Sequence, residues 1–587
     1  MTSPVARYAR GRSWRSLDLF GVVGWTLAIA LLWLILYPLI ATFFRVFTDA
    51  GSFDFTAMEK VFTDASFYTA ARNTGIVLVT AGPAALLIGS VFAWLNERTD
   101  AAFGVISRLL PLIPLLIPPI ALAVGWVFLA QRRAGFLNGY LRSGLDLVGV
   151  NLTEGPLNIG TWPGMLFVYT IALVPYGYLV VSAALRNMDT SLEEASRMSG
   201  AGPWNTVLRI SLPAIRPALA SASLLLVIVG VSFFSVPRTI GSLARIDTVS
   251  VYIVRLTQTF PSRLDESVAV SLLLLVVIGA VWMVQRRMTR GGRHALIGGK
   301  AGTASLVRLG KWRWLARTVM VGYIMAVSVL PFAALTVVAL QPFWQATIDP
   351  SILSLNNIKE FLFVPDSNPR IALFNSLRLG VMGGTLAMIV AAILISYARE
   401  KKGYTARIIE GTTKVPGAIS NLVIGVAILV ALAGEPFNLR GTLLILLLGY
   451  LVIYMPQASI AAEVARGQVG EELLEASYML GGSRFRTSRS ILLPLMRPGL
   501  AAGWALVFVV IVGDLTASAI LSGPQNIVVG SIFLQIWEAG RFAHLATLGM
   551  VICLTTASVV GIVLALSGRK GKRSPKQDAE TVASAVT

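Results

Sequence analysis

The sequence predicts an all-α, polytopic membrane protein with about twelve transmembrane helices in two parallel six-helix repeats. Three observations support this prediction. Of the 587 residues, 55% are hydrophobic and only 13% are charged, about half of the roughly 25% charged residues of a soluble domain. Apolar stretches of the length that crosses a bilayer as a helix, about 20 residues, recur along the chain. The second half also repeats motifs of the first half at a nearly constant spacing.

The apolar stretches are taken as helices because only helices or closed barrels satisfy the backbone hydrogen bonds in lipid. The first runs from residue 17 to residue 44, which is longer than the apolar core of a signal peptide, about 7–15 residues, so we expect an uncleaved span. The other spans of the first half are expected at about 73–95, 105–130, 162–185, 215–237 and 266–285. Those of the second half are expected at about 314–340, 371–396, 411–433, 441–464, 498–521 and 544–567.

Two of these spans contain residues that a simple lipid-facing helix would not need. Pro111, Pro114, Pro118 and Pro119 crowd the stretch 105–130, where they indicate either a broken, pore-lining helix or a tolerated kink. Asp514 lies in the eleventh span. An ionisable residue inside the membrane is costly, so Asp514 is a candidate for the translocation path, with a structural partnership to a neighbouring helix as the alternative.

Basic residues predict the orientation of the chain. The net charge is +20, with 49 Lys and Arg against 29 Asp and Glu. No basic stripe lies on a soluble fold, so we expect a lipid bilayer rather than nucleic acid as the partner. The stretch 286–317 holds nine basic residues and 569–576 holds five, which predicts that both termini are cytoplasmic in the cell (inner) membrane. Arg132, Arg133 and Arg142 are the exception, on an expected external loop.

The expected organisation has five parts. A basic cytoplasmic N-terminus covers 1–16, the first repeat 17–285, a basic cytoplasmic linker 286–313, the second repeat 314–567 and a cytoplasmic tail 568–587.

The internal repeat is visible in matched motifs. Glu194, Ala195 and Ser196 recur as Glu475, Ala476 and Ser477, at an offset of 475 − 194 = 281. The same offset relates Gly200 to Gly481, Ile210 to Ile491, Leu212 and Pro213 to Leu493 and Pro494, and Arg216 and Pro217 to Arg497 and Pro498. Asn73 and Pro114 match Asn375 and Pro416 at an offset of 302. The difference of 302 − 281 = 21 residues places an insertion around 131–161 of the first half. Since each half has an even number of spans, both halves face the same way.

Polar loops at 186–214 and 465–497 carry the strongest motif. Ser191 followed by Glu194 predicts a capping box at the start of a helix. Gly200 predicts a left-handed turn at its end, before a second short helix. In the other loop, Glu471 and Glu472 suit the first turn of a helix. The alternative of ordinary amphipathic connectors is disfavoured because the same spacing of Glu-Ala, Gly and Ile-x-Leu-Pro occurs at equivalent places in both repeats.

This spacing resembles the EAA loop of permeases from binding-protein-dependent ABC importers, and the resemblance covers nearly the whole chain as two fused permease units. Ser196 and Ser477 stand where that family usually has a third Ala. The resemblance implies that each loop forms a coupling helix seated in a cleft of a separate ABC ATPase subunit, two of which form a dimer. It also implies an extracytoplasmic substrate-binding protein. The implied coupling residues are Glu194, Ala195, Gly200, Leu212, Pro213, Glu475, Ala476, Gly481, Leu493 and Pro494.

Finer motifs resemble the ferric-iron type of fused permease. They are the segments 117–126, 135–138, 185–189, 236–241, 244–247 and 513–521. The resemblance implies ferric iron as the substrate. Related fused permeases carry thiamine or 2-aminoethylphosphonate, which remain alternatives, and a twelve-span secondary transporter is a further one.

No catalytic residue, metal site or cofactor is expected in this chain. It has one cysteine, Cys553, and two histidines, His294 and His544, too few for a zinc cluster or an imidazole-based active site. The glycine-containing stretch 298–301 lacks the spacing of a phosphate-binding loop. ATP must therefore be hydrolysed by a partner. A membrane-embedded enzyme would need clustered His, Asp or Glu, and a scaffold would not need two matched loops.

Overall fold

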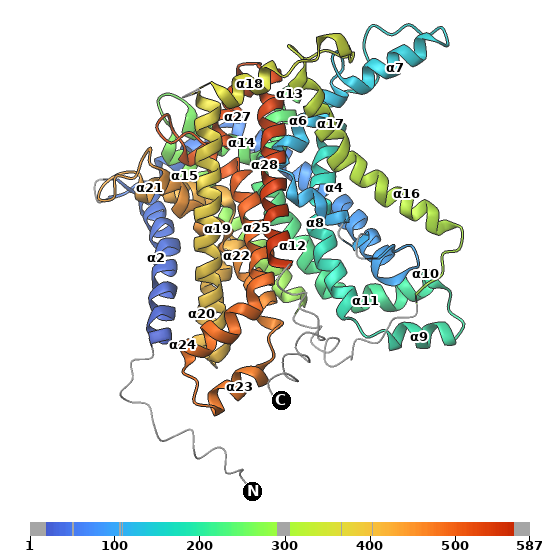
Figure 1. Cartoon of the computed structure of the whole chain (residues 1–587). Coiled ribbons are helices and arrows are strands. Elements are labelled where there is room, and N and C mark those ends of the chain that lie inside the picture. Colours follow the sequence, from blue (N-terminus) through green and yellow to red (C-terminus); the bar gives the residue numbers. More distant parts are fainter. Residues whose placement is uncertain are drawn as a thin grey trace, which may run out of the picture.

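The computed structural model describes residues 19–49, 52–104, 107–108, 110–289, 306–364, 367–401 and 403–568, which form a helical bundle (Figure 1). The strands in this part of the chain are the two-residue β1 (Thr48–Asp49) and β2 (Ser52–Phe53), which pair in a small hairpin. The predicted N-terminal segment 1–16, most of the linker 286–313 and most of the tail 568–587 lie outside the described residues.

Nine helices of the described chain are long and apolar enough to cross a membrane. The number of candidate spans is eleven if each of two bent helix pairs is counted as one further span. The unbroken spans are α2 (Leu19–Phe47), α4 (Ala65–Arg98), α8 (Trp162–Asn187), α15 (Leu264–Thr289), α16 to α17 (Trp312–Leu340), α19 (Asn368–Glu400), α22 (Leu443–Gly467), α25 (Leu493–Val512) and α28 (Phe542–Gly568). Asp64, Thr161 and Thr442 cap α4, α8 and α22 by accepting a hydrogen bond from a backbone amide of the first turn. The prediction of an all-α polytopic protein with about twelve spans is confirmed in outline.

The third predicted span of each half is broken. In the first half it consists of η1 (Leu110–Leu116) and α6 (Pro119–Ala130), and Pro118 between them has an extended ψ of 129°. A residue before proline avoids the helical region, so the Pro118–Pro119 pair ends one segment and begins the next. In the second half α20 (Tyr404–Lys414) with η6 (Val415–Ala418) meets α21 (Asn421–Leu432) at a bend of 102°. The first break was one of two predicted outcomes, whereas the expected plain span over 411–433 was wrong.

The fifth spans also differ from single straight helices. The helical unit Pro203–Ala214 meets α12 (Arg216–Ser232) at 70°. In the second half α25 ends at Val512, and a separate helix α26 (Thr516–Leu521) begins after a short break. The shorter elements of the chain are α3 (Thr56–Thr63), α7 (Phe136–Asp146), α9 (Ser191–Met198), α10 (Pro203–Thr206), η2 (Val207–Ser211), α11 (Leu212–Ala214), η3 (Pro237–Gly241), α13 (Ser242–Ala244), α14 (Val249–Gln258), η4 (Met325–Val329), η5 (Pro350–Ile352), α18 (Asn356–Phe363), α23 (Glu471–Met479), α24 (Arg484–Thr487), η7 (Ser488–Leu492) and α27 (Val529–Glu538).

The element order confirms the internal repeat. The series α8, α9, α10, α12, α14 and α15 recurs as α22, α23, α24, α25, α27 and α28. The matched asparagines make the same contact, because Asn73 and Asn375 each donate a side-chain hydrogen bond to a backbone carbonyl just before α14 or α27, at 2.9 and 2.8 Å. The insertion of the first half contains α7. The ten-residue helices α14 and α27 were not predicted, because they are too short to be recognised as spans.

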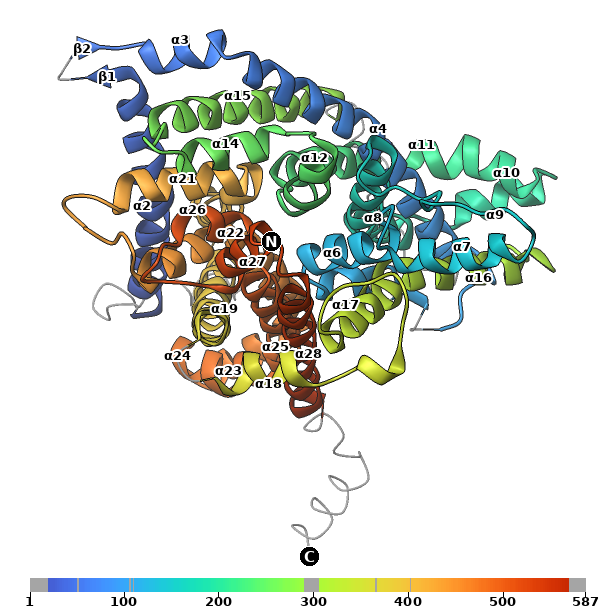
Figure 2. The ribbon, with the colours of Figure 1, turned by 90° about the horizontal axis from the view of Figure 1, so that it is seen from above.

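The first span of each repeat packs against the other repeat. Figure 2 shows α2 beside α21 of the second half, where Trp33 and Tyr37 pack against Phe437. Conversely, α17 of the second half packs closely on α6 of the first, so closely that a Cβ added at Gly125 would lie 2.5 Å from the Cβ of Pro331. Both repeats therefore share one continuous apolar core. In Figure 1 the short helices α9 and α23 lie at the same end of the bundle, and α7, α18 and α27 lie at the other.

Candidate functional site

The two polar loops form matching helix–turn–helix elements, termed loop A (186–214) and loop B (465–497). In loop A, α9 ends in a turn in which Gly200 has a φ of +83°, and in loop B, α23 ends at Gly481 with a φ of +80°. Both turns close with the same pair of backbone hydrogen bonds, at 3.0 and 3.1 Å in loop A and 3.0 and 2.9 Å in loop B. The pattern is that of a Schellman turn, in which glycine supplies the left-handed residue. The left-handed turn predicted at Gly200 is confirmed, and Gly481 forms the same turn in loop B.

The start of α9 differs from the prediction. Ser191 is the first residue of the helix rather than its cap, and no capping box forms with Glu194. Instead, the Asp189 carboxylate accepts a hydrogen bond of 2.9 Å from the Ser191 amide. The amide and hydroxyl of Ser191 hold the pKa of the Asp189 carboxyl below its ordinary value. Asp189 therefore supplies the side-chain acceptor at the start of α9. The predicted capping box had given this role to Ser191, two residues later.

A side-chain hydrogen bond joins the two short helices within each loop. The hydroxyls of Ser196 and Thr206 are 3.0 Å apart in loop A, and those of Ser477 and Thr487 are 2.8 Å apart in loop B. Both threonines are buried. The serines that replace the usual third Ala therefore fix α9 to α10 and α23 to α24. The offset of 281 between Thr206 and Thr487 was a signal for this contact that the sequence analysis did not use.

The tips of both loops carry exposed apolar side chains at equivalent positions. Met198 is 86% exposed and Met479 is 89% exposed. Trp204 in loop A and Leu480 in loop B are also largely exposed. Monomeric surfaces rarely leave such side chains clustered in water, so these tips indicate a protein interaction surface.

The predicted coupling residues occupy two places in each loop. Those on or next to the first helix are Glu194, Ala195 and Gly200 in loop A and Glu475, Ala476 and Gly481 in loop B. All of these are exposed except Glu194, which is half-buried. Leu212 and Pro213 begin α11, and Leu493 and Pro494 begin α25, each directly after a π-helical turn. Proline has no amide to donate into that turn, which is consistent with its widening.

Loop A is attached to the bundle through Glu193, which the sequence analysis did not single out. The Arg98 guanidinium, at the end of α4, forms an ion pair with Glu193 at 2.9 Å, and both side chains are at most 4% exposed. Ser211 donates a hydrogen bond of 2.6 Å to the same carboxylate. Arg98 also donates to the backbone carbonyl of Leu185, at 2.5 Å. No local spacing pattern could have predicted a pair formed by residues this far apart in the sequence.

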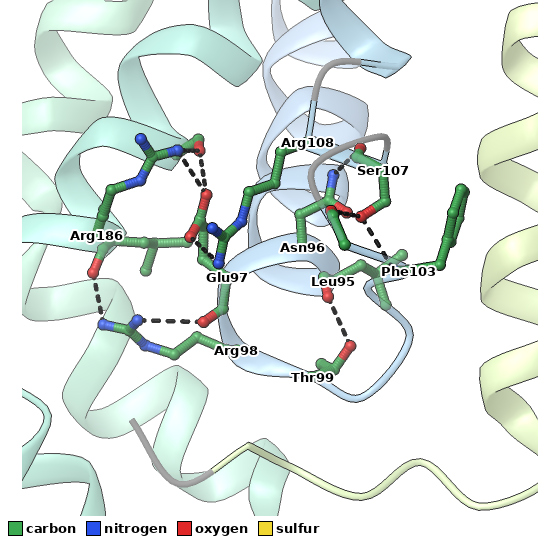
Figure 3. A network of polar contacts seen from close by, with 12 residues as sticks. Leu95, Asn96, Glu97, Arg98, Thr99, Phe103, Ser107, Arg108 and Arg186 are labelled. Carbon is green, nitrogen blue, oxygen red and sulfur yellow. Dashed lines mark hydrogen bonds and ion pairs between the residues drawn. The ribbon is translucent and has the colours of Figure 1, made fainter. Parts of the chain in front are cut away.

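A second polar group lies beside Arg98 at the end of α4. Figure 3 shows the buried Glu97 carboxylate accepting a hydrogen bond from Arg186, and Arg108 approaching it. The N–O distances are 2.9 and 3.5 Å, and Ser182 donates at 2.9 Å. Both arginines are half-exposed. Adjacent residues of α4 thus connect the span to α8 through Glu97 and to loop A through Arg98.

The two repeats also contact each other where their spans are broken. Ser232, at the end of α12, donates a hydrogen bond of 2.9 Å to Ser420, in the break before α21. The equivalent pair is Gly513 and Pro118, where a Cβ added to the glycine would lie 2.9 Å from the proline ring. Each broken third span therefore contacts the end of the fifth span of the other repeat.

Asp514 follows this second contact and is 6% exposed. Its carboxylate accepts hydrogen bonds from the Tyr454 hydroxyl at 2.7 Å and from the Ser518 amide at 2.9 Å. The equivalent residue of the first repeat is Phe233, so the polar cluster belongs to the second repeat. Among the described residues no group of three or more His, Cys, Asp or Glu side chains could hold a metal ion.

Comparison with known proteins agrees with this architecture. The family described as binding-protein-dependent transport system inner membrane component matches the chain twice, over residues 85–290 and 383–568. The ferric transport system permease protein FbpB of Actinobacillus pleuropneumoniae is 22% identical over 92% of this chain and 77% of its own. The Fe(3+)-transport system permease protein FbpB 2 of Haemophilus influenzae is 23% identical over 79% of this chain and 83% of its own.

One solved structure is also similar, though weakly. It is a bacterial ABC transporter involved in the import of the acidic polysaccharide alginate, with 20% identity, a TM-score of 0.35 and coverage of 43% of this chain and 88% of that chain. The two family matches, in contrast, span more than half of the chain and coincide with its two repeats. The chain therefore belongs to the family of binding-protein-dependent transport system inner membrane components, as a fused, two-repeat and non-catalytic permease of an ABC importer.

Proposed function

We propose that loops A and B dock on a dimer of separate ABC ATPase subunits and that an extracytoplasmic binding protein delivers the substrate to the opposite end. One observation supports this proposal above the others. The two loops present the same left-handed glycine, the same Ser–Thr hydrogen bond and an exposed methionine at equivalent positions. In this proposal Glu194, Ala195 and Gly200 with Leu212 and Pro213 form the first docking site. Glu475, Ala476, Gly481, Leu493 and Pro494 form the second.

The proposed mechanism is a rocking motion of the two repeats. Closure of the ATPase dimer on ATP would move both loops, and the attached spans would follow. The contacts between Ser232 and Ser420 and between Pro118 and Gly513 lie between the repeats, so they would open and close with the path. Binding on the outer side must then bias the ATPase in return, because coupling between two sites is reciprocal.

The proposed orientation places both loops and both termini in the cytoplasm of the inner membrane, with 1–16, 286–313 and 568–587 as cytoplasmic segments flanking the two repeats. The basic residues near α7 are an apparent exception to the positive-inside rule. However, Arg132 and Arg133 both pair with Glu154, each at 2.8 Å. The Arg133 guanidinium holds the pKa of the Glu154 carboxyl below its ordinary value, so this pairing offsets part of the external positive charge.

Cysteine labelling in intact cells tests the orientation. The natural Cys553 is buried, so single cysteines can be added with little background. The exposed positions Met198, Met479 and Tyr140 are suitable in cells that lack the ATPase subunit, which would otherwise cover both loops. In such cells Met198→Cys and Met479→Cys should resist a membrane-impermeant maleimide and react after permeabilisation, while Tyr140→Cys should react at once. Outside labelling of either methionine position would overturn the orientation.

ATP hydrolysis tests the partner. The purified chain should hydrolyse no ATP, and hydrolysis should begin when the matching ATPase subunit is added. A secondary transporter would instead move substrate into vesicles that contain this chain alone. Uptake driven by an ion gradient without any ATPase subunit would therefore contradict the proposal.

Ferric iron is the proposed substrate, because the similar permeases of Actinobacillus pleuropneumoniae and Haemophilus influenzae are named for ferric transport. Asp514 is proposed to lie on the translocation path. A strain lacking the gene should lose high-affinity uptake of radioactive ferric iron and keep thiamine and 2-aminoethylphosphonate uptake. Loss of either of the latter two, with iron uptake intact, would assign that substrate instead. The Asp514→Asn variant should lower uptake while its ATPase subunit still co-purifies.

A further inference from the structure

We propose that the two loops are attached to the bundle unequally: loop A is a stiff arm, fixed by the Arg98–Glu193 ion pair in which both side chains are buried, and loop B is a more compliant arm, held by apolar contacts and by ion pairs to an exposed carboxylate. This inference rests on the proposed function, because stiffness matters only if the loops transmit force from an ATPase. It assigns Arg98, Glu193 and Ser211 a positioning role, since none of them needs to touch the partner.

In loop A the attachment is polar and buried. Glu193 is 2% exposed, and its two carboxylate oxygens have different partners, Arg98 at 2.9 Å and Ser211 at 2.6 Å. The Arg98 guanidinium in turn contacts the last turn of α8 through the Leu185 carbonyl. The Glu193 side chain of α9 therefore contacts α4 and η2 directly, and it is connected to α8 through Arg98.

The last part of the inter-repeat linker and the start of α16 reinforce Arg98, the residue that carries the guanidinium. The Val307 amide donates a hydrogen bond of 2.9 Å to the Arg98 carbonyl, and its own carbonyl accepts one from Asp100 at 3.1 Å. The Asp100 side chain accepts from the Leu309 amide at 2.9 Å. Arg317 donates to the Ala101 carbonyl at 3.0 Å. The backbone next to Arg98 is thus held from both sides.

In loop B the positions equivalent to Glu193 and Ser211 are apolar. At the offset of 281, Glu193 corresponds to Leu474 and Ser211 to Leu492. These two leucines belong to a small buried cluster with Ala465, Val469 and Met496. Polar contacts at the start of α23 join Glu471 to the buried Arg466 at 3.0 Å and to Arg399, at the end of α19, at 4.0 Å, but Glu471 is 58% exposed. Ion pairs of so exposed a carboxylate are weakened by solvent.

The two kinds of attachment have different mechanical consequences. Apolar burial is non-directional and roughly proportional to area, so the leucines can slide while they remain buried. A buried ion pair needs one geometry, because a separated charge would be left without compensation in a dry site. Replacing such a pair with apolar residues often leaves the free energy of unfolding unchanged. The pair in loop A therefore indicates that α9 is held in one position, rather than that the fold needs the pair for stability.

Hydrogen–deuterium exchange on the purified full chain tests the stiffness directly, without any ATPase. The amides of α9 should exchange about tenfold more slowly than those of α23. A triple variant, Arg98→Met with Glu193→Leu and Ser211→Leu, gives loop A the two buried leucines of loop B, removes the arginine that would otherwise lose its partner, and should bring the exchange of α9 close to the rate of α23. A matched control, Lys414→Met with Glu463→Leu, removes an ion pair of 2.6 Å outside both loops and should change neither rate.

Equal exchange of α9 and α23 in the native chain, or an unchanged α9 in the triple variant, would overturn the proposal. Should the triple variant not yield a monodisperse protein, Glu193→Gln replaces it. That variant keeps the shape and the Ser211 contact but leaves the buried Arg98 charge without a partner, so it should accelerate the exchange of α9 at least as much as the triple variant.

The transport consequence is measured as substrate moved per ATP hydrolysed in the assembled complex. The triple variant should lower this ratio by about fivefold or more, the range of a typical coupling free energy. An unchanged ratio together with faster α9 exchange would show that stiffness does not serve coupling. Failure of the native chain to bind any ATPase subunit would instead remove the proposed function, and the exchange result would stand separately.

Discussion

Replacing both Gly200 and Gly481 with valine is expected to abolish substrate uptake while the protein stays in the membrane. Both glycines have a positive φ, +83° and +80°. A Cβ added at either position would meet nothing within 4 Å, so the effect comes from backbone conformation rather than from a clash. Left-handed backbone costs an L residue about 1–2 kcal/mol, and a β-branched residue tolerates it poorly. The turn should therefore relax and move the exposed tips of both loops.

The measurement is substrate uptake and co-purification of the ATPase subunit, each normalised to membrane abundance. Uptake should fall by about tenfold or more, because a coupling free energy of about 1–3 kcal/mol corresponds to changes of that size. Single variants should be unequal, since loop A carries the buried ion pair and loop B does not. Normal uptake and normal ATPase retention in the double variant would show that the loops are mere connectors.

The chain provides matched controls for this experiment. Gly202 and Gly470 lie in the same two loops, with φ of −66° and −63°, and an added Cβ would again meet nothing within 4 Å. Valine at these two positions should be tolerated by the backbone. Asparagine enters the left-handed region more readily than valine, so Gly200→Asn with Gly481→Asn should retain more uptake than the valine pair.

A disulfide between the two repeats is expected to stop transport reversibly. The Ser232 and Ser420 hydroxyls are 2.9 Å apart across the repeats, so cysteines at both positions lie within reach of a disulfide. Oxidation of the Ser232→Cys, Ser420→Cys variant would tie the end of α12 to the break before α21. Since rocking must separate the repeats, uptake should fall to background on oxidation and return on reduction.

The single-cysteine variants are the controls, since neither can form this crosslink. Cys553 is buried on α28 and should not interfere. Mass spectrometry of proteolytic fragments measures the crosslinked fraction. Full uptake by a fully crosslinked protein would exclude movement between Ser232 and Ser420 from the transport cycle.

The long spans and the glycine turns could be predicted because each depends on a local property. Apolar length defines a span in lipid, and a glycine after a polar helix defines a left-handed turn. The breaks were harder. Four prolines signalled the first one, whereas Pro416 alone did not signal the bend of 102° in the second repeat. The capping box failed because Asp189 competes with Ser191 for the same helix start.

The remaining features depend on contacts between distant segments. Arg98 and Glu193 meet only because α4 ends beside loop A, and no spacing in the sequence encodes that approach. The packing of each first span against the other repeat is likewise a property of the assembled bundle. The helices α14 and α27 were missed for another reason, since a helix of ten residues, seven of them buried, is too short to be taken for a span.

The hydrogen bonds of Val307, Leu309 and Arg317 have a consequence for gene architecture. Val307 and Leu309 lie at the end of the linker and Arg317 lies in α16, yet all three bind the first repeat at or just after the end of α4. The helices α2 and α17, each of which packs against the other repeat, add two further sets of non-covalent contacts. Two separately translated polypeptides, divided within 290–305, are therefore expected to complement one another as a heterodimer. The covalent fusion would then fix equal amounts of the two halves, whereas the binding of one half to the other would not depend on the fusion.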